Sequence, residues 1–260
     1  MSSSRWDELG ARESPAWYLD PVVALQKREV HVDLLRRVLE QAPPPRRVLK
    51  TDLFEEACGE DQLLGDFPSA AGLLCGLDTA FSEVLRTARR FPRLAGGLVT
   101  ADLRRLPFRD EAFDFVLSTS SLDHFDTFAE LEQALAEIAR VLAPGGRLLI
   151  TFDNLWNPLY HLLRSAGRAG LLPFPLGRTP SPRALPALLR RHGLEAEDRH
   201  WLIHNPRGVS TLVFLALRRL LGRHAGGPIR FLLHLFALGG RLPTRRFTAC
   251  FVAVCARKHP

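Results

Sequence analysis

Short apolar runs alternate with amphipathic runs from about residue 46 to residue 152. This alternation is typical of parallel strands that are linked by helices. Glycine, proline or acidic residues bound each apolar run. The predicted strands are residues 47–52, 73–78, 98–102, 113–119 and 147–152, and two final strands are expected at 194–203 and 247–256. The pattern therefore predicts an α/β fold around a mostly parallel sheet.

Helical spacing marks the segments between these strands. The strongest case is 128–142, where apolar residues recur every three or four positions before Ala143-Pro144-Gly145-Gly146 ends the helix. Further helices are expected at 20–39, at 81–90 and at 181–192, the last opened by Ser181 and Pro182. Residues 1–45 are interpreted as an N-terminal helical cap and residues 46–260 as one domain.

Two segments of that domain do not fit the strand-helix alternation. Residues 155–179 are apolar and irregular, and they are expected either to pack as loop and helix or to line a pocket. Residues 205–245 are too long for a hairpin loop and predict a helical insertion before the last strand.

Composition limits the class of protein. The chain has 260 residues, and 35 Lys and Arg against 28 Asp and Glu give a formal net charge of +7, which favours anionic partners. Four scattered cysteines without a CxxC pair indicate neither a disulfide scaffold nor a zinc site, so no metal is expected. No secretory signal and no uninterrupted membrane-spanning run are evident, so the expected location is cytoplasmic, with association at a membrane surface left open.

Acidic residues follow three of the predicted strands, at Asp52, Asp78 and Asp102. A carboxylate after the second strand of such a sheet can accept hydrogen bonds from both ribose hydroxyls of a nucleotide-like ligand. Each acid taken alone can also serve only to cap the next helix. Three acidic residues in comparable places after their strands favour a ligand site at this edge of the sheet.

The blocks at 101–108, 113–118 and 138–148, with Asp110 between the first two, resemble the class I S-adenosylmethionine-dependent methyltransferases, in particular the type 11 branch. Gly76-Leu77-Asp78 followed by Phe81-Ser82 is similar to the second acidic motif of that family. The resemblance implies a Rossmann-like seven-stranded sheet with helices on both faces and an antiparallel last strand. It implies S-adenosyl-L-methionine as the cofactor, an activated methyl donor whose transfer depends mainly on alignment.

The same resemblance assigns roles to individual residues. Asp78 would hold the ribose hydroxyls, Asp102 and the Leu103 backbone would meet the adenine, and Ser118 would lie near the methionine end. His124, after the fourth strand, is the candidate general base, because an imidazole has a pKa near neutrality. Its alternative role is to shape the loop.

The first motif departs from the family. Where the family has an acid and a glycine-rich turn, residues 48–61 contain one glycine, Gly59. Asp52, Glu56 or both are expected to supply the carboxylate that faces the cofactor's amino group, with the Thr51 hydroxyl at the same edge. Either a variant loop binds the cofactor or the fold persists without binding it, and the remaining acids favour binding.

The predicted function is methyl transfer from S-adenosyl-L-methionine to a small, hydrophobic or lipid-like acceptor. The alternative is a non-catalytic relative that acts through its apolar insertion. Arginines flank the apolar residues of that insertion, which suits a lid over an acceptor, a peripheral contact with an anionic membrane, or a homodimer contact. Modification of nucleic acid has only the basic charge in its favour, so no nucleic-acid partner is expected.

Overall fold

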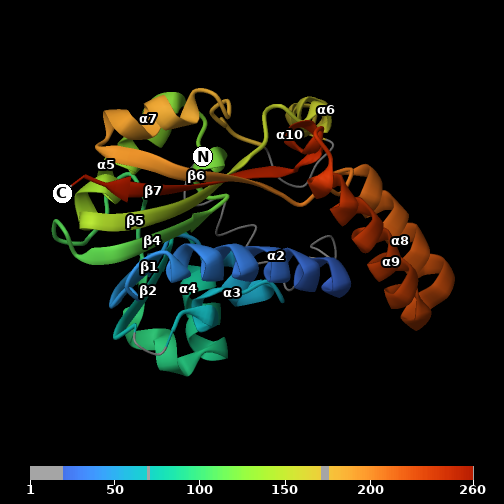
Figure 1. Ribbon diagram of the computed structural model, residues 1–260. Coiled ribbons are helices and arrows are strands. Elements are labelled where there is room, and N and C mark those ends of the chain that lie inside the picture. Colours follow the sequence, from blue (N-terminus) through green and yellow to red (C-terminus); the bar gives the residue numbers. More distant parts are fainter. Residues whose placement is uncertain (1–19, 69–70, 171–175, 260) are drawn as a thin grey trace.

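The computed structural model describes residues 20–68, 71–170 and 176–259. Its centre is a seven-stranded sheet in the order β3-β2-β1-β4-β5-β7-β6 (Figure 1). The strands are β1 (Arg47–Lys50), β2 (Leu73–Asp78), β3 (Leu98–Thr100), β4 (Phe113–Thr119), β5 (Leu142–Asp153), β6 (Leu194–Leu202) and β7 (Phe251–Lys258). β7 runs antiparallel to both β5 and β6, whereas the pairs among β1 to β5 are parallel. The predicted Rossmann-like seven-stranded sheet is confirmed.

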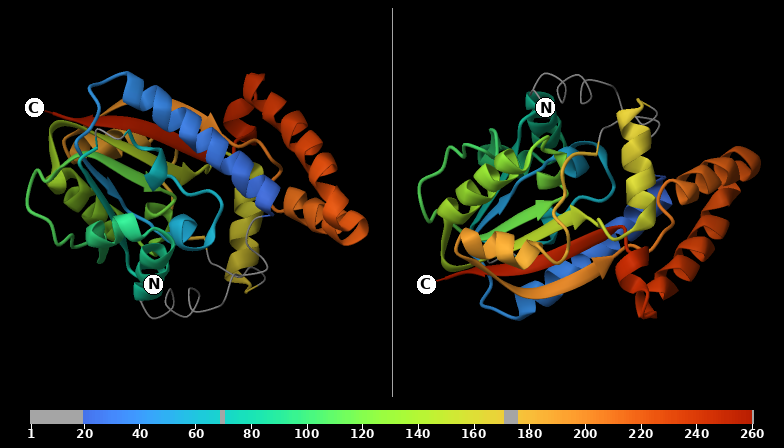
Figure 2. Two further views of the ribbon diagram at one scale, coloured as in Figure 1. Left: turned by 90° about the horizontal axis from the view of Figure 1, so that it is seen from below. Right: turned by 90° about the horizontal axis from the view of Figure 1, so that it is seen from above.

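Helices cover both faces of this sheet. The α-helices of the described residues are α2 (Pro21–Glu40), α3 (Phe54–Cys58), α4 (Phe81–Arg90), α5 (Phe128–Val141), α6 (Pro158–Arg168), α7 (Leu185–Arg191), α8 (Val209–Leu221), α9 (Gly226–Ala237) and α10 (Arg245–Thr248). Figure 2 shows α2 across one face, with α5 and α7 on the other. Along β5, Ile150 faces the core under α5 and Leu149 faces the core under α2, as the two-residue period of a strand requires. Both faces are therefore closed by apolar packing.

Three predicted boundaries are wrong by four residues or more. β5 begins at Leu142, because Leu142 already pairs with Phe113 and Gly145, at φ +74°, lets the expected turn continue as an irregular strand. α7 begins at Leu185, since Ser181 opens a turn in which its hydroxyl accepts from the Ala184 N–H at 3.2 Å. Phe247 lies in α10, four residues before the strand it was expected to start.

The predicted insertion forms α8, α9 and α10, and it projects beyond the carboxyl edge of the sheet (Figure 1). It leaves the sheet after Leu202 and returns at Phe251, and these two residues are direct partners in the β6–β7 ladder. The carboxyl ends of β1, β2, β4 and β5 meet at this same edge. The strand order reverses between β1 and β4, which is where open α/β sheets bind ligands.

Candidate functional site

Asp78 ties two loops together at the carboxyl edge. Its Oδ2 accepts a hydrogen bond from the Leu53 N–H at 3.0 Å, and its Oδ1 accepts one from the Ala80 N–H at 2.9 Å. Each oxygen keeps further lone-pair capacity, because a carboxylate can accept about four hydrogen bonds. The side chain is half-buried, so the structure holds it in one orientation with capacity for a ligand's donors.

Asp52 lies next to Asp78 in the loop after β1. Its Oδ1 accepts from the N–H of Phe54, the first residue of α3, at 2.8 Å. Burial raises the pKa of Asp52 well above its ordinary value, and the charges of Glu55 and Asp78 raise it further. Burial also raises the pKa of Asp78. Two carboxyl groups that resist ionisation in this way favour a cationic ligand beside them, since a positive charge would stabilise both carboxylates.

A buried ion-pair cluster holds the loop after β1. Lys50 is fully buried, and its Nζ lies 2.8 Å from Glu56 Oε2 and 3.3 Å from Glu55 Oε2, while it also donates to the Asp52 carbonyl. Burial lowers the pKa of Lys50, but Glu56 and Glu55 outweigh it and hold that pKa above its ordinary value. The sequence offered one overlooked signal for this cluster, a lysine at the end of an apolar strand.

The same cluster accounts for two residues that were expected at the cofactor. Glu56 is buried, and its Oε1 accepts from the N–H groups of Leu63 at 2.9 Å and Leu64 at 3.2 Å. A Cβ at Gly59 would collide with the Asp61 carboxylate. Glu56 and Gly59 therefore build the loop from inside, whereas Asp52 lies at the edge with Asp78.

A hydroxyl pair links the ends of β1 and β4. Thr51 Oγ1 donates to Ser118 Oγ at 2.9 Å and lies 3.3 Å from Ser121 Oγ. Thr51 and Ser118 are both buried. The structure thus brings together the two predicted hydroxyl residues at the point where the strand order reverses.

Asp102 lies in the loop after β3 and is held by Arg104. Arg104 Nη2 and Nε donate to Asp102 at 2.6 and 3.0 Å, and the Arg104 N–H donates at 2.8 Å. Burial raises the pKa of Asp102, but the bonds from Arg104 outweigh it and leave that pKa below its ordinary value. The Leu103 side chain is buried in the main core. A ligand at Asp102 would have to share this carboxylate with Arg104.

A second acidic group lies at the ends of β4 and β5. Asp123 Oδ2 accepts from the Asp153 N–H at 2.8 Å, and Arg207 forms an ion pair with Asp153. Burial and the charge of Asp153 raise the pKa of Asp123 to about 8. Sequence reasoning missed Arg207 as part of this group, because it comes from the insertion, 54 positions after Asp153.

His124 follows Asp123 directly. Burial lowers the pKa of its imidazole below the ordinary value, so the ring is neutral at pH 7. A neutral imidazole can accept a proton, which is what the predicted general base requires.

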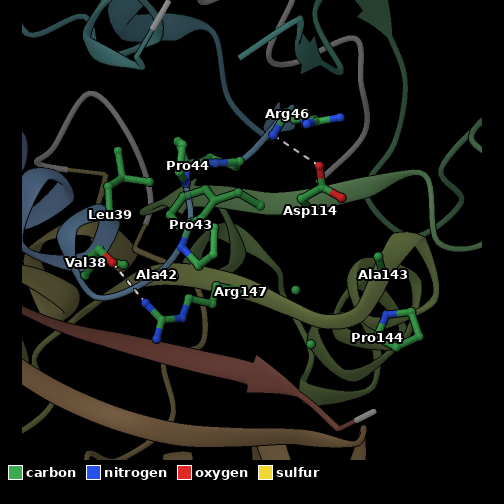
Figure 3. Close-up of a pocket in the computed structure, with 14 residues that line it drawn as sticks. Val38, Leu39, Ala42, Pro43, Pro44, Arg46, Asp114, Ala143, Pro144 and Arg147 are labelled. Carbon is green, nitrogen blue, oxygen red and sulfur yellow. Dashed lines mark hydrogen bonds between the residues drawn. The ribbon is translucent and has the colours of Figure 1, made fainter. Parts of the chain in front are cut away.

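A cavity of about 310 Å³ lies at the opposite edge of the sheet (Figure 3). Residues that precede β1 and that begin β4 and β5 line it, among them Pro43, Arg46, Asp114 and Arg147. Arg147 donates to the Val38 carbonyl at 3.0 Å and the Arg46 N–H donates to Asp114 at 3.2 Å. This cavity is at the amino ends of the parallel strands, away from the aspartates described above.

Comparison with known proteins agrees with this arrangement. Residues 54–150 match the family model described as "Methyltransferase domain". Residues 54–150 are thus similar to that methyltransferase domain. Over 167 residues it is 37% identical to the malonyl-[acyl-carrier protein] O-methyltransferase of Methylococcus capsulatus, a match that covers 64% of this chain and 57% of that protein.

Two further matches extend the comparison. The chain is 38% identical over 129 residues to the demethylmenaquinone methyltransferase of Thermus thermophilus, which covers 48% of this chain and 53% of that enzyme. The chain thus spans little more than half the length of these two relatives. The crystal structure of the N-methyltransferase NodS from Bradyrhizobium japonicum in complex with S-adenosyl-L-homocysteine superposes with a TM-score of 0.59 at 14% identity, covering 99% of each chain. That likeness shows the shared fold.

The residues at this edge fit S-adenosyl-L-methionine, the cofactor that the resemblance implies. The spare acceptor capacity of Asp78 suits ribose hydroxyls, and the raised pKa values of Asp52 and Asp78 suit the cofactor's positively charged sulfonium and amino groups. The first motif remains atypical, because β1 ends in the ion-paired Lys50 and the loop after it contains one glycine, Gly59.

Proposed function

We propose that this domain transfers the methyl group of S-adenosyl-L-methionine to a small, hydrophobic or lipid-like acceptor. The observation that carries the proposal is the Asp78 carboxylate, which two backbone N–H groups orient at the carboxyl edge beside the reversal of strand order. The names of the two relatives, which refer to malonyl-[acyl-carrier protein] and demethylmenaquinone, support an acceptor of this kind.

Each residue at this edge has its own role in the proposed cofactor site. Asp78 binds the ribose hydroxyls, Asp102 and the Leu103 backbone contact the adenine, and Asp52 with Thr51 faces the amino group. Ser118 lies beside the methionine end, while Glu56 and Gly59 act indirectly by fixing the loop after β1. When bound, the cofactor supplies an activated methyl group, so these residues need only hold it in line with the acceptor.

His124 would receive the acceptor's proton. Its lowered pKa keeps the imidazole neutral at pH 7, so it can accept a proton throughout the physiological range. The need for a general base depends on the acceptor atom, because a hydroxyl or an acidic carbon loses a proton when it is methylated.

Calorimetric titration with S-adenosyl-L-methionine and S-adenosyl-L-homocysteine tests cofactor binding. We expect micromolar affinity, and we expect Asp78→Ala to weaken it by about 100-fold, since each hydrogen bond to a charged group contributes roughly 1.5–3 kcal/mol. Asp33→Ala is the matched control, because it removes an exposed acid on α2 that precedes Asp78 by 45 positions in the sequence. Binding that Asp78→Ala leaves unchanged would contradict the proposed site.

The alternative is a non-catalytic methyltransferase-like protein. The buried Lys50–Glu56 pair favours it, because this pair occupies the place where the family has its cofactor-binding first motif. Absence of heat with both cofactor forms, from a protein whose circular dichroism shows that it is folded, would support this alternative. Methyl transfer from radiolabelled cofactor to a quinone or to an acyl thioester would exclude it.

A further inference from the structure

The insertion at residues 205–248 carries the positive charge of this protein. It contains eight arginines and no Asp, Glu or Lys, so it contributes +8 while the formal charge of the whole chain is +7, and the remaining residues sum to −1. Arg207 pairs with Asp153, and Arg218 pairs with Asp20. The other six arginines form no ion pair within the described part of the chain. Such a concentration of unpaired charge favours an anionic partner.

An inner apolar stripe accounts for how α8 and α9 pack on the protein. Phe214 of α8 and Ile229 and Leu233 of α9 are buried together, and Val22 and Val23 of α2 pack against them. Arg218 Nε lies 2.5 Å from Asp20 Oδ2 at the start of α2. These contacts attach the α8–α9 hairpin (Val209–Ala237) firmly to α2.

An outer apolar stripe remains uncovered on each helix. On α8 it consists of Val209, Leu212, Val213 and Leu220. Leu212 and Val213 follow Val209 by three and four positions, and Leu220 follows Val213 by seven, so all four lie along one side of the helix. Leu212 is 69% exposed and Leu220 is 79% exposed. Their positions on the helix differ from that of the inner residue Phe214.

On α9 the outer stripe is Phe231 and Leu235, continued by Leu238 directly after the helix; the intervals are four and three, on the side away from Ile229 and Leu233. Phe231 is 69% exposed. Packing within the described chain therefore leaves these apolar side chains uncovered.

We infer that the α8–α9 hairpin docks on the surface of an anionic lipid bilayer. Amphipathic helices that combine exposed large apolar side chains with arginines lie in the interface of such membranes, where the apolar residues enter the acyl boundary and the arginines meet the headgroups. A second copy of this chain fits less well, because it would bring the same unpaired arginines face to face. A lid over an acceptor would point these apolar side chains toward the sheet, whereas they are exposed.

The hairpin rests on the bilayer and does not cross it. α8 has 13 residues and α9 has 12. At 1.5 Å per residue, helices of this length reach roughly 20 Å, against a hydrocarbon core of about 30 Å. No helix in the described residues has the length and apolar character that a membrane crossing needs. Docking is thus peripheral, and it brings the carboxyl edge of the sheet close to the membrane because Arg207 joins the insertion to Asp153 there.

Vesicle flotation of the full chain without cofactor tests this inference separately from the proposed methyl transfer. The probes are vesicles of phosphatidylcholine with phosphatidylglycerol and vesicles of phosphatidylcholine alone. We expect binding to the anionic vesicles that added salt weakens. The double substitution Leu220→Ser with Phe231→Ser, and separately Arg219→Glu with Arg230→Glu, should each lower the partition coefficient at least tenfold. Sizing chromatography and circular dichroism accompany each variant.

The matched control is Phe128→Ser with Arg190→Glu, which changes an exposed phenylalanine and an exposed arginine on α5 and α7. We expect it to bind like the unmodified protein. No binding to anionic vesicles, equal binding to both vesicle types, or hairpin variants that bind normally would each overturn the inference. A dimer that the hairpin variants convert to monomers, without vesicle binding by the original protein, would assign the outer stripes to a contact between copies instead.

Discussion

Lys50 and Glu56 form an ion pair of 2.8 Å in which both side chains are almost completely buried. Such a pair is costly to desolvate, and it persists only when further hydrogen bonds satisfy its partners. Here Leu63 and Leu64 donate their N–H groups to Glu56, and Lys50 donates to the Asp52 carbonyl. The loop that carries Asp52 is therefore shaped by internal charges and contains one glycine, Gly59.

Lys50→Met should lower the free energy of unfolding by about 3–5 kcal/mol, because it leaves Glu56 buried without its ion-pair partner, whereas Glu55 keeps Lys27 at 3.1 Å. Urea denaturation measures this change. Arg36→Met is the control, since the Arg36–Asp33 pair is exposed and contributes at most about 1 kcal/mol. The double variant Lys50→Met with Glu56→Gln should recover part of the loss. Equal effects at Lys50 and Arg36 would show that the buried pair has no special importance.

Asp123 should make stability depend on pH. Its pKa in the folded protein is about 8, above the value of about 3.9 in an unfolded chain, so the folded state retains a proton that the unfolded state has released. This contribution is fully present below pH 4 and is lost as pH rises toward 8. Asp123→Asn cannot titrate, so the difference in unfolding free energy between the variant and the original protein should grow in the variant's favour across this window. A difference that stays constant with pH would refute the assignment.

Thr51→Val should lower the free energy of unfolding by roughly 1–3 kcal/mol, because it leaves the buried Ser118 hydroxyl without its donor. Adding Ser118→Ala should remove most of that loss, and a double-mutant cycle from urea denaturation measures the coupling. If Thr51 also faces the cofactor, Thr51→Val will weaken calorimetric binding while Ser118→Ala with intact Thr51 weakens it less. Additive effects of the two substitutions would mean that the pair is not coupled.

His124→Gln should lower kcat by about 100-fold if the imidazole is the general base, since positioned proton transfer contributes roughly 10²–10⁴-fold. Cofactor affinity should be unchanged. Because burial lowers the pKa of His124, the rate of the original protein should fall only below the pH at which a free imidazole is protonated. Initial rates as a function of pH measure both effects. A variant that keeps its kcat but melts at a lower temperature would show that His124 only shapes the loop.

The periodic elements could be predicted from the sequence because their signals are local. The bounds of β2, β4 and α4 agree with those expected, since each has a clear apolar period and a nearby residue that ends it. The Ala143-Pro144-Gly145-Gly146 segment was misjudged for the opposite reason. Its turn residues are locally convincing, yet pairing with the start of β4 holds Leu142 in the sheet.

The contacts of the candidate site were harder to predict because they join residues distant in sequence. The bond from Leu53 to Asp78 spans 25 positions, and the Arg207–Asp153 pair spans 54. The aspartates at the strand ends were identified by position alone, and their role at the cofactor remains a prediction. The one local signal for the buried cluster, a lysine at the end of an apolar strand, did not identify Glu56 as its partner.

The pairing of Leu202 with Phe251 has a consequence for how this protein is organised. The chain departs from the sheet and rejoins it at adjacent backbone positions, so a linker of a few residues can close the gap without shifting either strand. The insertion therefore begins and ends at neighbouring positions of the sheet. Replacing the insertion by such a linker should keep the register of the β6–β7 ladder, while it removes the apolar contacts of the hairpin with Val22 and Val23.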